Sequence, residues 1–259
     1  MVNKLIVDIR QFIFGLQDSF PLVGRPLIIA WRLLDNLKFT IQKKVLQLKA
    51  RFRAGDNQFK KELIVFFEKE KAYQPFLHPD FRDISFLRQG ELRFKIIKKN
   101  ISVSKGTLLD IGANLGYFCH KFEAEGFDCY ALEENRMFCY FMEKLKKAEN
   151  RKFKVIPQSI FEYNKNKELT FDVVLALSVF HNFLERKDLY FNLIKLLKRL
   201  KTKELFFETY LPNEFKPEAY YKNYTPDQFV NFIIQNSCFN KAKFIGASEE
   251  GRPLYKLTP

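Results

Sequence analysis

Two glycines, Gly112 and Gly116, follow the apolar run at 107–111 and precede an amphipathic stretch. A glycine directly after a strand permits a sharp turn, and a second one lets a ligand approach the backbone where a side chain would collide with it. The spacing lacks the further glycine of the dinucleotide fingerprint, and no Gly-Lys-Ser/Thr of a phosphate-binding loop follows. The pattern therefore predicts a binding loop for a ligand less anionic than a pyrophosphate.

A carboxylate, Glu133, ends the next strand-like run of the sequence, Tyr130-Ala-Leu-Glu-Glu134. In nucleotide-binding α/β sheets, an acid at the tip of the second strand accepts hydrogen bonds from ribose hydroxyls. Asp110 precedes the glycine turn at the tip of the first strand. The glycine turn and the acid in register predict a nucleoside-binding site at the carboxyl edge of a sheet.

The elements that must position these residues alternate from residue 106 onward. Near-continuous apolar strands such as Val173-Val-Leu-Ala-Leu177 are typical of a buried parallel sheet, because helices cover both of its faces. The closing pair of strands predicts an antiparallel hairpin at the sheet edge. The predicted strands are 107–111, 128–133, 153–157, 171–178, 203–209, 241–246 and 254–257, with helices at 115–125, 135–149, 186–200 and 226–235. The last helix is predicted to open with Thr225-Pro-Asp as its cap and first turn.

Residues 86–257 resemble the class I S-adenosylmethionine-dependent methyltransferases. Asp110-Ile-Gly-Ala-Asn-Leu-Gly116 is similar to the family's first motif, Glu133 to its ribose-binding acid, and Phe171-Asp-Val-Val-Leu-Ala-Leu-Ser178 to its fourth-strand motif. The resemblance implies a Rossmann-like α/β fold whose seven-stranded, mostly parallel sheet has the order 3-2-1-4-5-7-6. It implies S-adenosylmethionine as cofactor and S-adenosylhomocysteine as product. The cofactor-binding residues it implies are Asp110, Gly112, Asn114, Gly116, Tyr117, Glu133, Ser159, Ile160 and Leu177.

Gln158-Ser-Ile-Phe161 departs from the family pattern, because the family often has an acid there, near the adenine. If the alignment holds, Ser159 or the backbone of Ile160 contacts the adenine amino group instead.

Methyl transfer to a hydroxyl needs an aligned acceptor and a group that removes its proton. His181, in the stretch that leaves the fourth strand, is a candidate general base, with Asn182 or Ser178 orienting the acceptor. The alternative is that His181 only hydrogen-bonds the loop or stacks near the sulfonium. Glu208 and Tyr210 leave the fifth strand on the same edge. Glu208 can bind sugar hydroxyls or share a proton with His181, or it is an acid satisfied by a neighbouring Lys or Arg.

Arg252, in the predicted hairpin Gly251-Arg-Pro-Leu-Tyr255, can meet an anionic group of a substrate or be simply solvated. No Asn-Pro-Pro-Tyr or Asp-Pro-Pro-Tyr follows the fourth strand and no Pro-Cys pair is present, which disfavours methylation of adenine amino groups or pyrimidine carbons. An oxygen acceptor is therefore expected. A looser resemblance to bacterial methyltransferases associated with surface-polysaccharide and glycolipid genes implies a carbohydrate or glycolipid acceptor of the cell envelope.

The net charge of +14 is concentrated at the N-terminal side, since residues 1–105 carry a net +11. Helical periodicity predicts amphipathic helices at 5–16 and 27–48, which are separated by a break at 19–24, and a third helix at 56–73. The second helix has a basic end. We expect residues 1–85 to form a basic helical extension and 86–259 the cofactor-binding domain. Such an extension suits an anionic membrane surface, an RNA substrate or a second subunit, including a homo-oligomer.

Two enzyme readings and one non-enzyme reading follow from these partners. A methyltransferase acting on a carbohydrate is the first, and an RNA methyltransferase that grips phosphates with the basic region is the second. A non-catalytic subunit that binds S-adenosylmethionine is the third.

The four cysteines form no CxxC pair, and the three histidines are too scattered to suggest a metal cluster, so no metal is expected. Free thiols, together with the absence of a signal-peptide pattern and of an apolar run long enough to span a bilayer, predict a cytoplasmic protein. The basic amphipathic helices add the expectation of peripheral binding at the inner membrane face.

Overall fold

A computed structural model describes residues 21–51, 57–68, 72–81, 83–211, 214 and 220–259. The chain divides into two compact units, Met1–Phe66 and Phe67–Pro259. This boundary lies before the predicted one at 85/86. Within the second unit, the backbone of Ala72 donates to the Ser85 carbonyl and accepts from the Leu87 N–H, which ties the two ends of this early segment together.

The first unit holds two described helices, α2 (Pro21–Arg51) and α3 (Gln58–Phe66). The helix expected at 27–48 begins earlier, at Pro21, so the predicted break at 19–24 falls partly inside α2. The helix expected at 56–73 ends at Phe66, because the chain at Ala72 runs extended beside Phe86. The helix expected at 5–16 lies outside the described residues.

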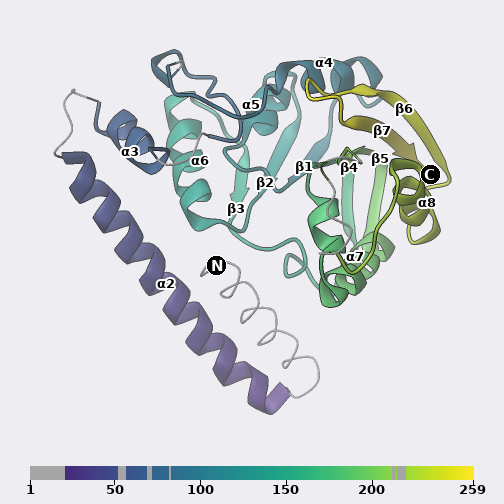
Figure 1. Cartoon of the computed structure of the whole chain (residues 1–259), viewed down its shortest axis with the longest axis horizontal. Helices are drawn as coiled ribbons and strands as arrows, with labels where there is room; N and C mark the ends of the chain where they lie inside the picture. Colours follow the sequence, from purple (N-terminus) through teal and green to yellow (C-terminus); the bar gives the residue numbers. More distant parts are fainter. Residues whose placement is uncertain (1–20, 52–56, 69–71, 82, 212–213, 215–219) are drawn as a thin grey trace. The chain divides into compact units, whose positions relative to one another are not determined.

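The second unit is built on a seven-stranded sheet in the order β3-β2-β1-β4-β5-β7-β6 (Figure 1). The first five strands pair in parallel, and β7 pairs antiparallel with both β5 and β6. The order and the mixed direction confirm the sequence-based prediction. The strands are β1 (Thr107–Ile111), β2 (Asp128–Leu132), β3 (Lys154–Ile156), β4 (Leu169–Leu177), β5 (Leu200–Glu208), β6 (Lys241–Ala247) and β7 (Pro253–Thr258).

Alternate residues of the central strands face two separate apolar layers. Val173 and Leu175 of β4 pack in one cluster with helices α4 (Glu91–Asn100), α5 (Tyr117–Ala124) and α6 (Arg136–Ala148). Val174 and Ala176 pack in the other with α7 (Lys187–Arg199) and α8 (Pro226–Gln235). Because side chains point alternately to the two faces of a strand, a continuous apolar run is what buries both faces.

Short elements connect these layers at the sheet's edge. The 3₁₀ helices η1 (Pro79–Phe81) and η2 (Phe180–Leu184) precede α4 and α7. Helix α8 begins with a capping box, in which Thr225 accepts from the Gln228 backbone and Gln228 accepts from Thr225 in return. This cap satisfies backbone donors that a helix start leaves unpaired, and it confirms the start predicted at Thr225-Pro-Asp.

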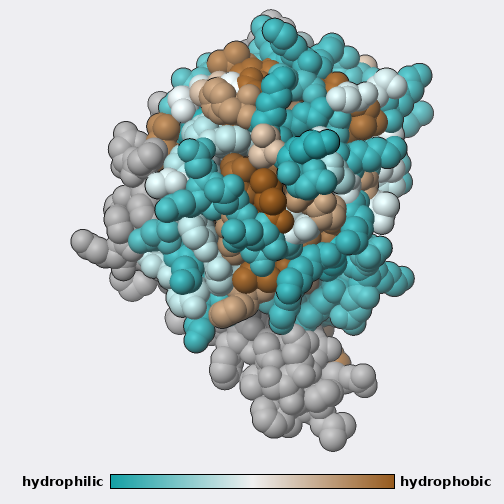
Figure 2. Space-filling model, turned by 90° about the vertical axis from the view of Figure 1, so that its right-hand side faces the viewer, coloured by the Kyte–Doolittle hydropathy of each residue, from teal (hydrophilic) through white to brown (hydrophobic). Residues whose placement is uncertain are grey.

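Hydrophilic side chains cover most of the face seen in Figure 2. The sheet's edge strand β6 carries exposed Lys241 and Lys243, and its register with β7 shifts between Phe244 and Gly246. Lysines and an irregular register discourage pairing with a further strand. Within the described part of the chain, no helix is both long and apolar enough to cross a membrane.

Candidate functional site

The glycine turn connects the end of β1 to α5 through three residues with positive φ: Gly112 (73°), Asn114 (53°) and Gly116 (80°). The N–H of Gly112 donates to the Leu132 carbonyl, which ties the turn to the end of β2 (2.9 Å). A Cβ at Gly116 would lie 2.9 Å from Met142 Cγ. Both the left-handed backbone and this contact require glycine at 116.

Two carboxylates flank this turn. Glu133 accepts hydrogen bonds from the backbone N–H groups of Asn114 (2.9 Å) and Asn135 (2.8 Å). Burial raises the pKa of Glu133 to about 7, and the two backbone donors oppose that shift. Burial also raises the pKa of Asp110 to about 7, with the charge of Glu133 adding to the shift and that of Arg93 opposing it.

Buried polar atoms at this turn lack partners among the described residues. They are Oδ2 of Asp110 and Oδ1 of Asn114. A buried acceptor without a donor is costly, and at a strand-end turn it marks a place for a polar ligand. The two oxygens fit a ligand that carries N–H or O–H donors.

The loop after β3, where the sequence predicts contacts of Ser159 or Ile160 with adenine, is held by Arg199, a residue that no sequence pattern led us to expect there. Arg199, in the last turn of α7, donates to the carbonyls of Ile160 (2.7 Å), Tyr163 (3.0 Å) and Asn164 (2.7 Å). Ile160 is buried, and Ser159 is partly exposed beside it. A basic residue in a final helical turn is ordinary, so the sequence carried no signal for this contact.

Tyr117 and Leu177 lie at the same edge, as predicted, but Tyr117 already has a partner. It is the first residue of α5, and its hydroxyl donates to Glu91 (3.1 Å). Its ring lies so close to Gly90 that a Cβ there would collide with it. Leu177 ends β4 and is buried.

Ser178, directly after β4, has a positive φ of 56° and lies between two charged side chains. Its hydroxyl donates to Glu208, and Arg252 Nη1 donates to the same hydroxyl oxygen (2.8 Å). Glu208 is 0% exposed and pairs with Arg93, which is 1% exposed (3.3 Å). Arg93 and Ser178 both contact Oε2 of Glu208, whereas Oε1 is buried and has no hydrogen-bond partner among the described residues.

Arg252 is also fully engaged rather than solvated. Its Nε and Nη2 donate to the two carboxylate oxygens of Glu214 (2.8 and 3.1 Å). Such a two-point pair fixes the plane of the guanidinium. The side chains of Arg93 and Glu214, which sequence reasoning missed, therefore order the edge around Ser178.

His181 lies in η2, next to this network. Burial and the charge of Arg252 lower its pKa to about 4, which keeps the imidazole neutral at pH 7, although Glu214 opposes the shift. Its Nδ1 is buried and has no hydrogen-bond partner among the residues described. The ring packs edge-on against Tyr210 (centroids 5.6 Å apart).

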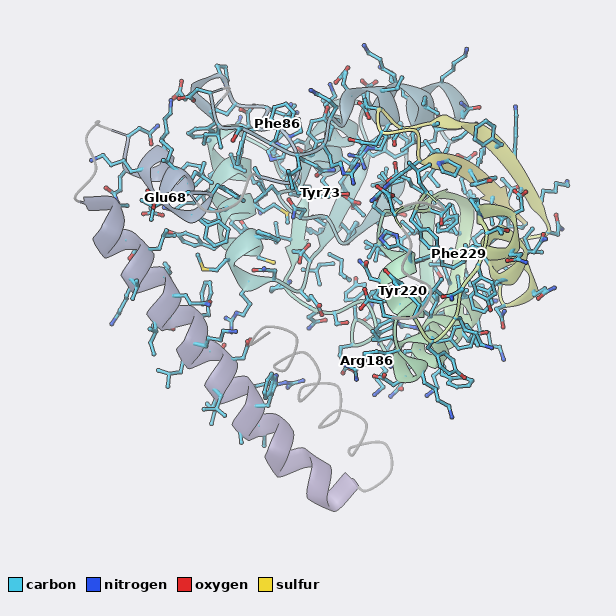
Figure 3. All side chains as sticks on the ribbon, viewed as in Figure 1. Glu68, Tyr73, Phe86, Arg186, Tyr220 and Phe229 are labelled. Atoms are coloured by element: carbon cyan, nitrogen blue, oxygen red, sulfur yellow. The ribbon has the colours of Figure 1, made fainter. Side chains whose placement is uncertain are left out.

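Tyr210 is buried, and its hydroxyl donates to the carbonyl of Tyr224 (2.7 Å). Asn182 is exposed beside His181. Tyr220 packs against the apolar cluster that includes Phe229 (Figure 3). The predicted acceptor residues His181, Asn182 and Tyr210 thus come from adjacent segments.

No protein-family model matches the sequence, and no curated protein matches it. Among solved structures, the bifunctional kinase-methyltransferase WbdD is similar, with a TM-score of 0.62 and 18% identity over 76% of this chain and 45% of that one. A higher-resolution WbdD structure gives 0.61 and 19%, over 76% and 46%. The PH0226 protein from Pyrococcus horikoshii OT3 gives 0.52 and 12%, over 75% and 98%.

The chain therefore spans under half the length of WbdD. At these identities the similarity establishes the fold, a Rossmann-like methyltransferase fold, which agrees with the sequence-based prediction. Because a fold does not fix function, the roles of individual residues depend on the geometry of the site.

Proposed function

We propose that this protein is an S-adenosylmethionine-dependent methyltransferase that releases S-adenosylhomocysteine. The observation that carries the proposal is the meeting of the glycine turn with Asp110 and Glu133 at the ends of β1 and β2. In open α/β sheets, this crevice outside the strand ends is where ligands bind. The fold shared with WbdD supports the same reading.

Each cofactor role is assigned to a residue whose atoms suit it. Glu133, when ionised, accepts from the ribose hydroxyls, and Gly112 and Gly116 let the ligand approach the backbone. Asp110 and Asn114 offer their unpartnered oxygens to donors of the ligand. Ser159, or the backbone of Ile160, is assigned to the adenine amino group. When bound, the cofactor supplies a methyl group on a sulfonium.

Isothermal titration with S-adenosylmethionine and S-adenosylhomocysteine tests this assignment. We expect micromolar binding by the wild type, lost in Gly112→Val and in Glu133→Ala. Asn240→Ala, an exposed change outside the site, is the control. Absence of binding by folded wild-type protein would overturn the proposal.

We further propose an oxygen acceptor on a carbohydrate or glycolipid of the cell envelope. The unpartnered, buried Nδ1 of His181 supports this, because it can accept a hydrogen bond from an acceptor hydroxyl, although the pKa of about 4 makes the imidazole a weaker base than free histidine. Asn182 is exposed beside it to orient the acceptor, and Tyr210 positions the imidazole through its ring. Glu208 and Arg252 both contact Ser178, and the unpartnered Oε1 of Glu208 can accept a hydrogen bond from an acceptor hydroxyl.

Transfer of a labelled methyl group to envelope glycans and lipids tests the acceptor. His181→Ala is expected to abolish transfer and retain cofactor affinity, whereas His181→Gln separates proton removal from packing. If wild-type protein binds the cofactor but methylates none of the acceptors tested, the alternative of a non-catalytic, cofactor-binding subunit is favoured.

We propose that the first unit binds an anionic membrane surface at the cytoplasmic face. Helix α2 exposes apolar side chains at a spacing of four, which are Ile29, Leu33, Leu37, Ile41 and Val45. Exposed Arg32 and Lys44 lie on the same helix. An apolar stripe with basic neighbours suits insertion among acidic headgroups.

Sedimentation with vesicles of neutral or acidic phospholipid tests the membrane proposal. We expect binding to acidic vesicles, lost in Leu37→Glu/Ile41→Glu and weakened by high salt. The alternative is that a second copy of the chain packs on this apolar stripe. That alternative would be favoured if the wild type forms a dimer, Leu37→Glu/Ile41→Glu dissociates it, and neither protein binds vesicles.

The net +11 of residues 1–105 favours RNA as the second candidate substrate. RNA binding carried by lysines and arginines falls steeply with salt, because bound counterions are released. A steep salt slope for structured RNA, combined with methyl transfer to RNA and none to glycans, would replace the carbohydrate assignment.

A further inference from the structure

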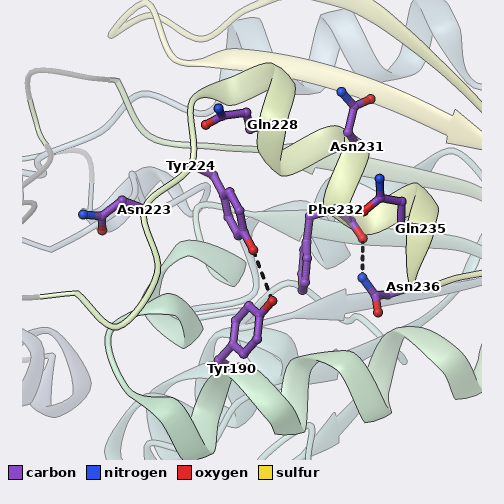
Figure 4. A pocket seen from close by; sticks show the side chains of 8 residues that line it. All are labelled: Tyr190, Asn223, Tyr224, Gln228, Asn231, Phe232, Gln235 and Asn236. Carbon is purple, nitrogen blue, oxygen red and sulfur yellow. Dashed lines mark hydrogen bonds between the residues drawn. The ribbon is translucent and has the colours of Figure 1, made fainter.

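A groove of about 410 Å³ lies in the helical layer formed by α7 and α8, apart from the glycine turn. This volume is in the range of small-ligand sites, roughly 300–1,000 Å³. Its lining combines three aromatic and five amide side chains, and no charged side chain occurs among the described residues that line it. They are Tyr190, Tyr224, Phe232, Asn223, Gln228, Asn231, Gln235 and Asn236 (Figure 4).

The aromatic rings form a fixed surface. Phe232 stacks on both Tyr190 and Tyr224, with centroids 5.3 Å apart in each pair. The two tyrosine hydroxyls meet at 3.1 Å. Phe232 itself is buried, and the partly exposed rings of Tyr190 and Tyr224 that it holds in place offer apolar surface at little further loss of side-chain freedom.

The amides supply matched donors and acceptors. Gln228, Asn231 and Gln235 recur at helical spacing on exposed positions of α8. Gln228 uses its carbonyl in the helix cap and Asn236 uses its amino group on the Phe232 carbonyl (2.8 Å). Gln228 therefore still has its amide NH₂ group as a donor, and Asn236 still has its amide oxygen as an acceptor. Asn231 and Gln235 make no side-chain hydrogen bond to the described residues. Amides can donate to one hydroxyl and accept from its neighbour.

We infer that this groove binds a neutral carbohydrate chain. A pyranose has one apolar face of C–H groups and a rim of adjacent hydroxyls, which match the rings and the amides. A phosphate or acidic sugar would find no cation in this lining. A peptide would need the same amides, and it is an outcome of the test below.

The groove connects to the candidate acceptor site through Tyr224. The Tyr224 ring lines the groove, and its carbonyl accepts from Tyr210, whose ring packs on His181. These contacts run through the buried side chain of Tyr210, so they couple the position of Tyr224 to that of His181 without joining the two sites by an open path. Sugar binding in the groove does not rest on the proposed function.

Binding of neutral oligosaccharides to the full chain tests the inference, by NMR shifts and calorimetry. The probes are di- to hexasaccharides of mannose, glucose, galactose and rhamnose, with oligogalacturonate as the acidic comparator and an uncharged Asn- and Gln-containing peptide as the other. We expect at least one neutral series to bind with affinity that rises with length, and oligogalacturonate and the peptide not to bind.

The variant Asn231→Ala/Gln235→Ala removes two exposed amides at positions where alanine favours the helix. It should bind the sugar roughly tenfold more weakly, since each lost hydrogen bond is worth about a factor of a few, with S-adenosylmethionine affinity unchanged. Asn240→Ala, an exposed amide beyond the end of α8 that does not line the groove, should match the wild type.

The outcomes separate the groove from the proposed function. If the protein binds the cofactor but no neutral sugar, or if the double variant binds sugar as tightly as the wild type, the proposal of a sugar-binding groove is wrong. The proposed methyltransferase function is unaffected by either result. Peptide binding lost in the double variant also overturns the carbohydrate assignment. If the wild type binds sugar, the double variant does not, and neither binds the cofactor, the sugar-binding groove is supported and the proposed methyltransferase function is wrong.

Discussion

The buried pair of Arg93 and Glu208 provides the sharpest test of how the site edge is held together. Both side chains are almost completely excluded from water, and the pair also orders Ser178. Replacing Arg93 with methionine keeps the volume but leaves the Glu208 carboxylate buried without its cation. Breaking a buried pair in this way costs about 3–5 kcal/mol. For a unit of this size, that loss lowers Tm by roughly 10 °C.

The pH dependence of this loss gives a second readout. Burial raises the pKa of Glu208, and Arg93 opposes the rise. Without Arg93 the folded-state pKa rises further above the unfolded value, so the folded protein binds a proton more tightly. Stability is then retained at low pH and lost as pH rises through the folded pKa. Arg93→Met should therefore approach the wild type as pH falls from 8 towards 5.

Thermal and urea unfolding at pH 5 and 8 measure both effects. The matched control is Arg88→Met, because Arg88 pairs with Glu214 at 3.3 Å where both side chains are partly exposed, and such pairs contribute about 0–1 kcal/mol. The double variant Arg93→Met/Glu208→Gln should lose less than the sum of its single variants. An Arg93→Met loss no larger than that of Arg88→Met, or one independent of pH, would refute this account.

Three further outcomes are expected. S-adenosylmethionine affinity, measured by calorimetry, should fall up to tenfold per pH unit below about 7, because the ribose hydroxyls need the ionised Glu133 whose pKa lies near 7, and this dependence should become shallower in Glu133→Gln, where only Asp110, whose pKa is also about 7, still titrates at the site. Gly116→Ala should cost about 2–4 kcal/mol in urea unfolding, from the left-handed backbone and the contact with Met142, and a loss below 1 kcal/mol would contradict the geometry. Arg199→Met should weaken cofactor binding and lower Tm, because the carbonyls of Ile160, Tyr163 and Asn164 lose a donor, whereas Arg186→Met, a change at the N-cap of α7 in a partly exposed pair with Asp188, should alter neither.

Much of the fold could be predicted because its signals are local. The apolar run at Val173–Leu177, the glycine turn and the cap at Thr225 each act within a few residues, and the structure confirms all three. The predicted end of the third helix, at residue 73, was wrong. The helical pattern continues in the sequence, but the structure ends α3 at Phe66 and pairs Ala72 with Phe86 of a later loop.

The candidate site was predictable only in part. Residues at strand ends were found because parallel strands bring their carboxyl ends to one edge. The arginines that order this edge were not found, because Arg93 reaches Glu208 and Arg199 reaches Ile160 across long separations in sequence. Their types and spacing are those of ordinary helical residues, so tertiary packing alone reveals these contacts.

The position of β7 between β5 and β6 constrains the order in which the sheet can be completed during synthesis. While the ribosome has not yet released residues 253–258, β6 has no neighbour to pair with and β5 remains an open edge. That edge carries the buried apolar side chains of Leu205 and Phe207. Arg252 enters with the same segment, so Ser178 gains its second partner in the same step. Without residues 252–258, the sheet would keep an open β5 edge and Ser178 would lack its second partner, so this short segment closes both the sheet and the site edge.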